Sequence, residues 1–175
     1  MADSSEQKAW REGGCACGAV RYRARPAAAL ALYRCHCRDC QKQTSSAFGL
    51  SMFMPAEAFE LTQGTPRKFA RQADSGRIID SFFCADCGSR IYNTSAARPG
   101  LVNLRPGTLD DPSGLTPVGD VWAARRQDWV DLLPGGVAYE TQPDDLTALI
   151  ERYAARKAAR GGAPDASPEA GDAGS

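Results

Sequence analysis

Short stretches of alternating apolar and polar residues, separated by glycine and proline, make up most of the chain before residue 124. Val20 to Arg23 is one example: two apolar residues alternate with two basic ones, as expected of a strand with one buried face. Comparable stretches predict further short strands at residues 30–33, 47–54, 59–61, 67–69, 77–83, 89–93, 101–104 and 118–123. Many short strands with this punctuation are typical of an all-β core, so we expect a mainly β fold.

The clearest helical pattern lies near the C-terminus. It begins after Pro143, a residue suited to the first turn of a helix, and Gly161-Gly162 ends it. Four apolar residues recur at helical spacing, namely Leu146, Leu149, Ile150 and Tyr153. We therefore expect a flexible leader over residues 1–10, one domain over 11–160 that includes this helix, and a disordered tail over 161–175, whose composition cannot bury apolar area.

Length and charge narrow the class of protein. A chain of 175 residues suits one domain with a real core, and a formal charge of zero gives no general attraction to nucleic acid or acidic membranes. A basic cluster (Arg67, Lys68, Arg71 and Arg77) is interpreted as mostly solvated surface. No apolar run approaches the ~20 residues of a membrane span, and residues 1–12 lack the apolar core of a signal peptide. The expected location is a reducing cytoplasm, with no nucleic-acid or membrane partner.

The seven cysteines form three clusters whose spacing is typical of metal ligands. Cys35, Cys37 and Cys40 follow one another as Cys-x-Cys-x-x-Cys, which lets three sulfurs converge on one ion at roughly 2.3 Å. The simplest partition joins the two remote pairs, Cys15 with Cys17 and Cys84 with Cys87, into a four-sulfur structural site. In a strand, alternate residues share a face, so the sulfurs of Cys15 and Cys17 can point at one ion. The sequence thus predicts two zinc ions per chain, one structural and one catalytic.

Alternatives remain for these clusters. The trio of Cys35, Cys37 and Cys40 can instead be a second closed site with a distant fourth ligand. His36, the one histidine, lies between two ligands, so its ring is expected to point away from their ion. A disulfide-exchange role for Cys84 and Cys87 is disfavoured because no βαβ pattern surrounds them. If residues 41–44 form a helical turn or two, Cys40 lies near its start, where backbone amides stabilise a thiolate.

An open zinc site with thiolate ligands suits a particular chemistry. A coordinating thiol loses its proton, and zinc can polarise a carbonyl as a Lewis acid. Both roles favour the addition of a thiol to an aldehyde, or the reverse cleavage of the carbon–sulfur bond. Iron can compete for soft ligands, but zinc is the usual ion of thiolate tetrahedra. With a single histidine, a hydrolase that uses a histidine base is disfavoured.

The cysteine motifs and their flanks resemble one known family. The matching stretches are residues 13–22 (GGCACGAVRY), 35–40 (CHCRDC), 82–89 (FFCADCGS), 107–111 (GTLDD) and Trp129. They resemble the glutathione-dependent formaldehyde-activating enzyme and centromere protein V family over about residues 10–143. The resemblance implies a β-tent-like zinc-binding fold of short antiparallel strands. It also implies a structural zinc on Cys15, Cys17, Cys84 and Cys87, and catalytic roles for Cys35, Cys37 and Cys40.

The activity that the resemblance implies is that of S-(hydroxymethyl)glutathione synthase, a carbon–sulfur lyase that condenses formaldehyde with glutathione. Two residues depart from many members of the family: Ser45 replaces a glycine, and Asp120 replaces a histidine and so removes a possible polar contact. Arg38, Lys42, Arg125 and Arg126 are candidate cations for the carboxylates of glutathione. The alternatives are the same chemistry on another aldehyde or thiol, and a non-catalytic zinc-stabilised binding module.

Overall fold

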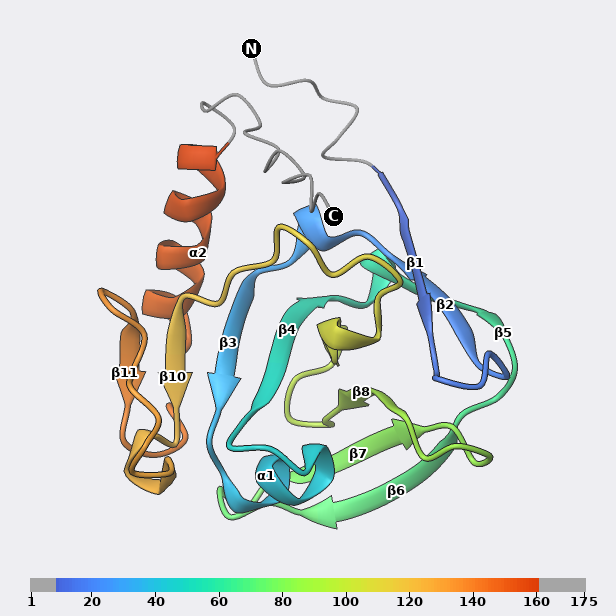
Figure 1. Cartoon of the computed structure of the whole chain (residues 1–175), viewed down its shortest axis with the longest axis horizontal. Coiled ribbons are helices and arrows are strands. Elements are labelled where there is room, and N and C mark those ends of the chain that lie inside the picture. Colours follow the sequence, from blue (N-terminus) through green and yellow to red (C-terminus); the bar gives the residue numbers. More distant parts are fainter. Residues whose placement is uncertain (1–8, 161–175) are drawn as a thin grey trace, which may run out of the picture.

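The computed structural model describes residues 9–160, and the predicted tail and most of the predicted leader lie outside this range. The fold is mainly β, as predicted, with two sheets and a C-terminal helix (Figure 1). The small sheet has the order β1-β2-β5 and the large sheet the order β11-β10-β3-β4-β9-β8-β7-β6.

The large sheet carries most of the strands. In chain order they are β3 (Ala31–Cys35), β4 (Gly49–Pro55), β6 (Arg67–Gln72), β7 (Ile78–Phe83), β8 (Arg90–Thr94), β9 (Leu101–Leu104), β10 (Gly119–Val121) and β11 (Val137–Tyr139). The pairs from β3 through β6 are antiparallel. β10, however, runs parallel to both β3 and β11, which corrects the expectation of antiparallel strands at this edge. Two consecutive strands that lie parallel require a crossover rather than a hairpin, and the segment between β10 and β11, residues 122–136, supplies it.

The small sheet lies on the opposite side of the molecule from the C-terminal helix (Figure 1). It contains β1 (Arg11–Gly14), β2 (Arg21–Ala24) and β5 (Phe59–Gln63), all antiparallel. β1 was not predicted, because Gly13 and Gly14 interrupt the alternation of apolar and polar residues. Gly13 is nevertheless required in this strand, since a Cβ on it would lie 2.5 Å from the Tyr22 ring. This contact packs β1 closely on β2 and so fixes the cysteine loop that follows it.

The predicted C-terminal helix is α2 (Thr147–Arg160), and it packs on the large sheet. Leu146, Leu149 and Tyr153 are buried, so the predicted apolar face is confirmed. Pro143 lies ahead of the helix rather than in its first turn. The N–H of Thr147 instead bonds to Asp145 Oδ1 at 2.8 Å. The other fully buried large side chains, which form the core between the sheets, include Tyr22, Leu32, Met52, Met54, Ile91 and Leu104.

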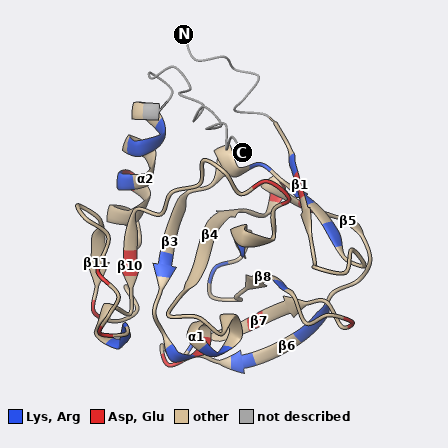
Figure 2. Ribbon diagram, viewed as in Figure 1, with Lys and Arg blue, Asp and Glu red and all other residues tan. Residues whose placement is uncertain are grey.

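Charged residues are spread over many elements rather than gathered on one (Figure 2). No helix within residues 9–160 is long and apolar enough to span a membrane.

Candidate metal centres and the cavity beside them

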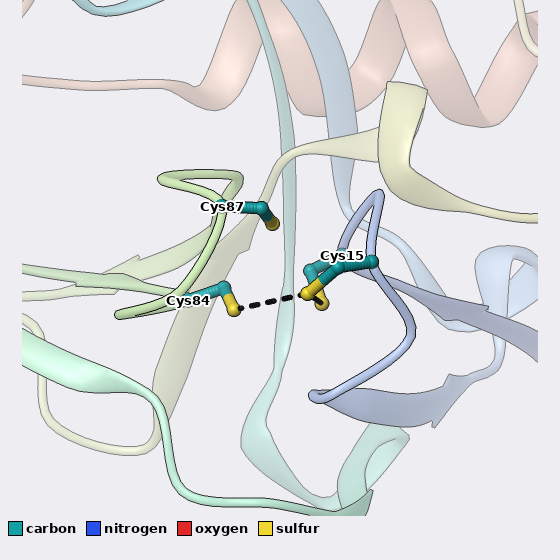
Figure 3. Close-up of side chains that lie close together, drawn as sticks. Cys15, Cys84 and Cys87 are labelled. Atoms are coloured by element: carbon teal, nitrogen blue, oxygen red, sulfur yellow. Dashed lines mark hydrogen bonds between the residues drawn. The ribbon is translucent and has the colours of Figure 1, made fainter.

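The four-sulfur centre joins the loop after β1 to the loop after β7. Cys15 and Cys17 come from the first loop, Cys84 and Cys87 from the second, and all four sulfurs lie within 4.8 Å of one another. The Cys15–Cys17 and Cys17–Cys84 sulfur distances are 3.5 and 3.7 Å. Tetrahedral zinc with bonds of about 2.3 Å separates its sulfurs by about 3.8 Å, so this donor set fits zinc. Figure 3 shows Cys84 and Cys87 facing the loop that carries Cys15.

The local backbone of this centre differs in one respect from the expectation. Cys15 and Cys17 lie in a turn rather than in a strand, so the turn, not strand alternation, brings their sulfurs together. Gly18 and Gly88 have φ of 80° and 74°, a region that glycine enters without steric cost.

Ser89 connects the two loops of this centre. Its hydroxyl accepts a hydrogen bond from the Ala16 N–H at 3.1 Å and lies 3.3 Å from Cys87 Sγ. The hydrogen bond to Ser89 lowers the pKa of Cys87 to about 5, which favours the thiolate that a metal ion requires. The Val20 N–H similarly bonds to Cys15 Sγ at 3.2 Å. The role of Ser89 was not predicted from the sequence, although Ser89 directly follows the Cys-x-x-Cys-Gly motif.

The three-sulfur centre lies between β3 and helix α1 (Arg38–Thr44). Cys35 ends β3, Cys37 caps α1, and Cys40 is in its first turn, with the Cys40 N–H 3.4 Å from Cys37 Sγ. The predicted helical turn therefore exists and begins earlier than expected. The three sulfurs lie within 4.8 Å of one another, and no other cysteine, histidine or acidic side chain among residues 9–160 joins the group. Hydrogen bonds from Cys35 and Cys37 lower the pKa of Cys40 to about 2.

His36 points away from this group, as predicted, into a buried polar cluster. Its Nε2 donates to Asp120 Oδ1 at 2.8 Å, because a carboxylate can only accept. Asp120 also accepts from Arg34 Nε at 2.6 Å and from the Leu133 N–H at 2.8 Å. The expectation that Asp120 removes a polar contact is therefore wrong: this residue anchors the loop between Cys35 and Cys37 to β10.

A cavity enclosing about 890 Å³, counted with the solvent at its mouth, opens beside the three-sulfur centre. Cys35, Cys37 and Cys40 form part of its wall. Four arginines also line it, namely Arg71, Arg77, Arg98 and Arg105. The four cations proposed from the sequence for the carboxylates of glutathione (Arg38, Lys42, Arg125 and Arg126) are not among its lining residues. Of the basic cluster, Arg71 and Arg77 are half-buried at the cavity, whereas Arg67 and Lys68 are exposed, as expected for most of that cluster.

The β6–β7 hairpin is held over this cavity by two ion pairs. Arg71 on β6 pairs with Asp39 of α1, and Asp74 at the hairpin turn pairs with Arg125. The Arg125 guanidinium lies 4.4 Å from the centre of the Trp122 ring, which lines the cavity. Trp122 has φ of 64°, an unfavourable value for a bulky residue, so the surrounding contacts must hold it there.

Tyr33 places a hydroxyl in the same cavity. It precedes Cys35 by two positions on β3, so the two side chains share a face of the strand. The Asn103 amide donates to its oxygen at 3.3 Å, which leaves the Tyr33 proton free to be donated. Burial raises the pKa of Tyr33 to about 12, so the hydroxyl keeps its proton at neutral pH.

Comparison with known proteins agrees with the cysteine pattern. A curated protein of Halomonas elongata, named "Putative glutathione-dependent formaldehyde-activating enzyme", is 26% identical over 126 residues, which cover 69% of this chain and 80% of that protein. A crystal structure of a Rhodobacter sphaeroides protein shares 19% identity over 61% of this chain and 91% of the other, with a TM-score of 0.45, a likeness too distant to support an inference. The sequence model described as "Glutathione-dependent formaldehyde-activating enzyme" matches residues 10–125, more than half of the chain. This chain therefore belongs to the glutathione-dependent formaldehyde-activating enzyme family.

Proposed function

We propose that this protein is a zinc-dependent carbon–sulfur lyase that joins glutathione to formaldehyde, with the activity of an S-(hydroxymethyl)glutathione synthase. The observation that carries the proposal is a group of three cysteine sulfurs, with no fourth protein ligand among residues 9–160, in the wall of a cavity. A closed structural zinc site uses four protein ligands, whereas a catalytic site leaves one position open. Membership of the family supplies the candidate substrates.

Two zinc ions are assigned on this basis. Cys15, Cys17, Cys84 and Cys87 would hold a structural ion that joins the N-terminal loop to β7. Cys35, Cys37 and Cys40 would hold a catalytic ion, which when bound supplies Lewis acidity and favours the thiolate form of a substrate thiol. All seven cysteines are free, which supports a location in the reducing cytoplasm.

The arginines of the cavity would bind the carboxylates of glutathione. Arg98 makes no ion pair with a described residue, and Arg77 is 3.9 Å from Asp144, which is fully exposed. Guanidinium groups form bidentate hydrogen bonds with carboxylates, so these two residues suit the two acidic ends of the tripeptide. Binding there would orient the thiol toward the three cysteines, which lie in the same cavity.

Tyr33 would donate the proton that the aldehyde oxygen requires. As the thiolate sulfur forms its bond to carbon, the carbonyl π electrons move to oxygen, and the Tyr33 hydroxyl protonates that oxygen to give the hydroxymethyl group. Solvent then returns a proton to Tyr33, which balances the proton lost earlier by the substrate thiol. A general acid of this kind typically accelerates a reaction by about 100-fold or more.

The test must separate catalysis from the spontaneous addition of glutathione to formaldehyde. We would measure exchange between ¹³C-formaldehyde and its glutathione adduct by NMR at equilibrium, with and without protein, alongside zinc content. Wild type should bind two zinc ions and accelerate exchange, whereas a Cys35/Cys37/Cys40 triple serine variant should bind one and give only the spontaneous rate. Tyr33→Phe should keep both ions and lose most of the acceleration.

Tyr92→Phe is the matched control, since Tyr92 is buried against Phe82 (ring centres 4.3 Å apart) and is not among the cavity-lining residues. It should behave as wild type. One zinc ion in wild type, or full acceleration by the triple serine variant, would refute the proposal and favour a zinc-stabilised binding module. Two ions without acceleration would direct the search to another aldehyde or thiol.

A further inference from the structure

Two arginines, Arg90 at the start of β8 and Arg105 after β9, have buried guanidinium groups without a carboxylate partner among the described residues. Both terminal nitrogens of Arg90 are buried and make no hydrogen bond within residues 9–160, and its Nε donates only to Asn93 Oδ1 at 3.2 Å. Arg105 is 7% exposed; its Nη1 donates to the Leu50 carbonyl at 2.9 Å and to Ser51 Oγ at 2.8 Å, and its Nε has no partner there.

Such an arrangement is costly unless an anion balances it. A buried guanidinium loses its hydration, and two like charges near each other add repulsion. Burial, followed by the charge of Arg105, lowers the pKa of Arg90 to about 9. Neutral groups such as Asn93 and Ser51 cannot cancel these charges. The two acidic residues that line the cavity, Asp39 and Asp74, are already paired with Arg71 and Arg125, so the balancing negative charge must come from another group.

Both arginines are connected to the cavity of the three-sulfur centre, Arg105 as part of its wall and Arg90 through a residue of that wall. Arg105 lines the same cavity as Cys35, Cys37 and Cys40, and it bonds to the carbonyl of Leu50. The preceding residue, Gly49, lies against Cys40: a Cβ on Gly49 would be 3.3 Å from the Cys40 Cβ. The partner of Arg90, Asn93, lines the cavity too.

We infer that Arg90 and Arg105 are the buried counter-charge of the three-cysteine centre, and that they bias its fourth position toward an anionic ligand such as a thiolate. This inference rests on the proposed function, because it takes the centre to hold a divalent ion. Three thiolates and a divalent ion carry one net negative charge. Two arginines overcompensate it by one, and a thiolate in the fourth position cancels that excess, whereas a neutral water leaves it.

The test uses the opposite signs that this role predicts in two backgrounds. In the zinc-loaded wild-type background, Arg90→Met should weaken zinc binding at the trio about tenfold to 100-fold, the range typical of groups just outside a metal's ligands. In the Cys35/Cys37/Cys40 triple serine background, where no thiolate balances the charge, the same change should leave the unfolding midpoint unchanged or raise it. The unfolding midpoint is also measured in the zinc-loaded wild-type background, where Arg90→Met should lower it, so any loss of packing is common to both backgrounds and cancels in the difference between the two midpoint shifts.

Two further variants make the result specific. Arg90→Lys keeps the charge and should stay within about threefold of wild type in zinc affinity, as measured by competition with a chelator. Arg25→Met is the matched control: Arg25 also has a buried Nε without a partner among residues 9–160, but it follows β2 in the small sheet, and it should leave the affinity of the trio unchanged.

The outcomes separate this inference from the proposed function. A wild type that takes up one ion only would refute both. Two ions in wild type with unchanged affinity in Arg90→Met would refute the counter-charge role and leave the proposed function standing. Destabilisation by Arg90→Met that is as large in the triple serine background as in wild type, or an Arg90→Lys as damaging as Arg90→Met, would show a structural rather than electrostatic role and would equally overturn the inference.

Discussion

Replacing Asp120 with asparagine tests how the three-cysteine loop is held in place. Asp120 is 1% exposed and accepts hydrogen bonds from His36, Arg34 and the Leu133 N–H. An asparagine of nearly the same shape keeps one acceptor oxygen, but its amide group would face a donor. The Asp120→Asn variant therefore removes the charge without creating a cavity.

The expected loss of stability follows from the partner that is left behind. The Arg34 side chain is 11% exposed, so without Asp120 it becomes a largely buried cation with no carboxylate. Breaking a buried ion pair on one side costs about 3–5 kcal/mol. That is a large share of the roughly 5–15 kcal/mol that stabilises a typical domain. Because His36 lies between Cys35 and Cys37, zinc binding at the trio should weaken at the same time.

The pH dependence gives an independent check. Burial would raise the pKa of Asp120, but the hydrogen bonds from His36, Arg34 and Leu133 outweigh it and lower the pKa to about 2 from 3.8. A carboxyl whose folded pKa is depressed stabilises the fold above its unfolded pKa, and this stabilisation is lost as the pH falls from about 4 toward 2. The shift corresponds to roughly 2–3 kcal/mol. The stability difference between wild type and Asp120→Asn should therefore shrink as the pH falls, by about half of that amount, roughly 1 kcal/mol, at pH 3.

Urea unfolding of the zinc-loaded proteins at pH 7 and pH 3 measures both effects. Repeating the measurement with a chelator at both pH values removes the contribution of zinc, which Asp120→Asn is expected to bind more weakly than wild type. Asp110→Asn is the control, because Asp110 pairs with Arg21 at the surface, where it is 53% exposed, and such pairs contribute at most about 1 kcal/mol. A loss below about 1 kcal/mol in Asp120→Asn at pH 7, or a difference that stays constant with pH, would refute the reasoning.

Three further substitutions follow from particular contacts. Gly119→Ala should destabilise the fold by about 1–3 kcal/mol in urea unfolding, since the added Cβ would lie 2.3 Å from the Val137 carbonyl oxygen. Gly107→Ala is the control: a Cβ there would have no atom within 4 Å, so the free energy of unfolding should change little. Asp145→Ala should lower the free energy of unfolding by about 1 kcal/mol, because the variant loses the side chain that caps α2. A lower thermal midpoint would show this loss. Arg98→Met should weaken glutathione binding about tenfold in calorimetry without changing zinc content; unchanged binding would remove Arg98 from the substrate site.

The two candidate metal centres could be predicted from the sequence because the spacing of their cysteines is local. Each cysteine cluster spans six residues or fewer, so the spacing alone limits how its sulfurs can be arranged. Joining Cys15 and Cys17 to Cys84 and Cys87 needed a further step, the expectation that a closed site has four ligands. The convergence of both groups is confirmed by the structure. Ser89 was missed because a serine hydroxyl has no distinctive sequence pattern.

The cavity could not be predicted, because it depends on contacts between distant segments. Arg71 and Arg77 belong to a hairpin whose sequence pattern indicates two strands but not the element that they cover. Once Arg71 pairs with Asp39 of α1, both arginines line the cavity. The parallel direction of β10 could not be predicted for a similar reason. Hydrophobic periodicity indicates which face of a strand is buried, but it does not indicate whether a neighbouring strand is parallel or antiparallel.

The two candidate centres differ in the exposure of their cysteines and in whether they border the cavity. Cys17 and Cys87 are exposed, yet their centre already has four sulfurs and therefore has no position for a substrate. Cys35 and Cys40 are buried, yet their centre has three sulfurs and borders the cavity. The wall of this cavity also contains the paired Arg71 and Asp39 and the strained Trp122. Selection among thiols would therefore depend on the shape and charge of the cavity more than on the metal ligands, and its arginines are the residues at which substrate preference should change first.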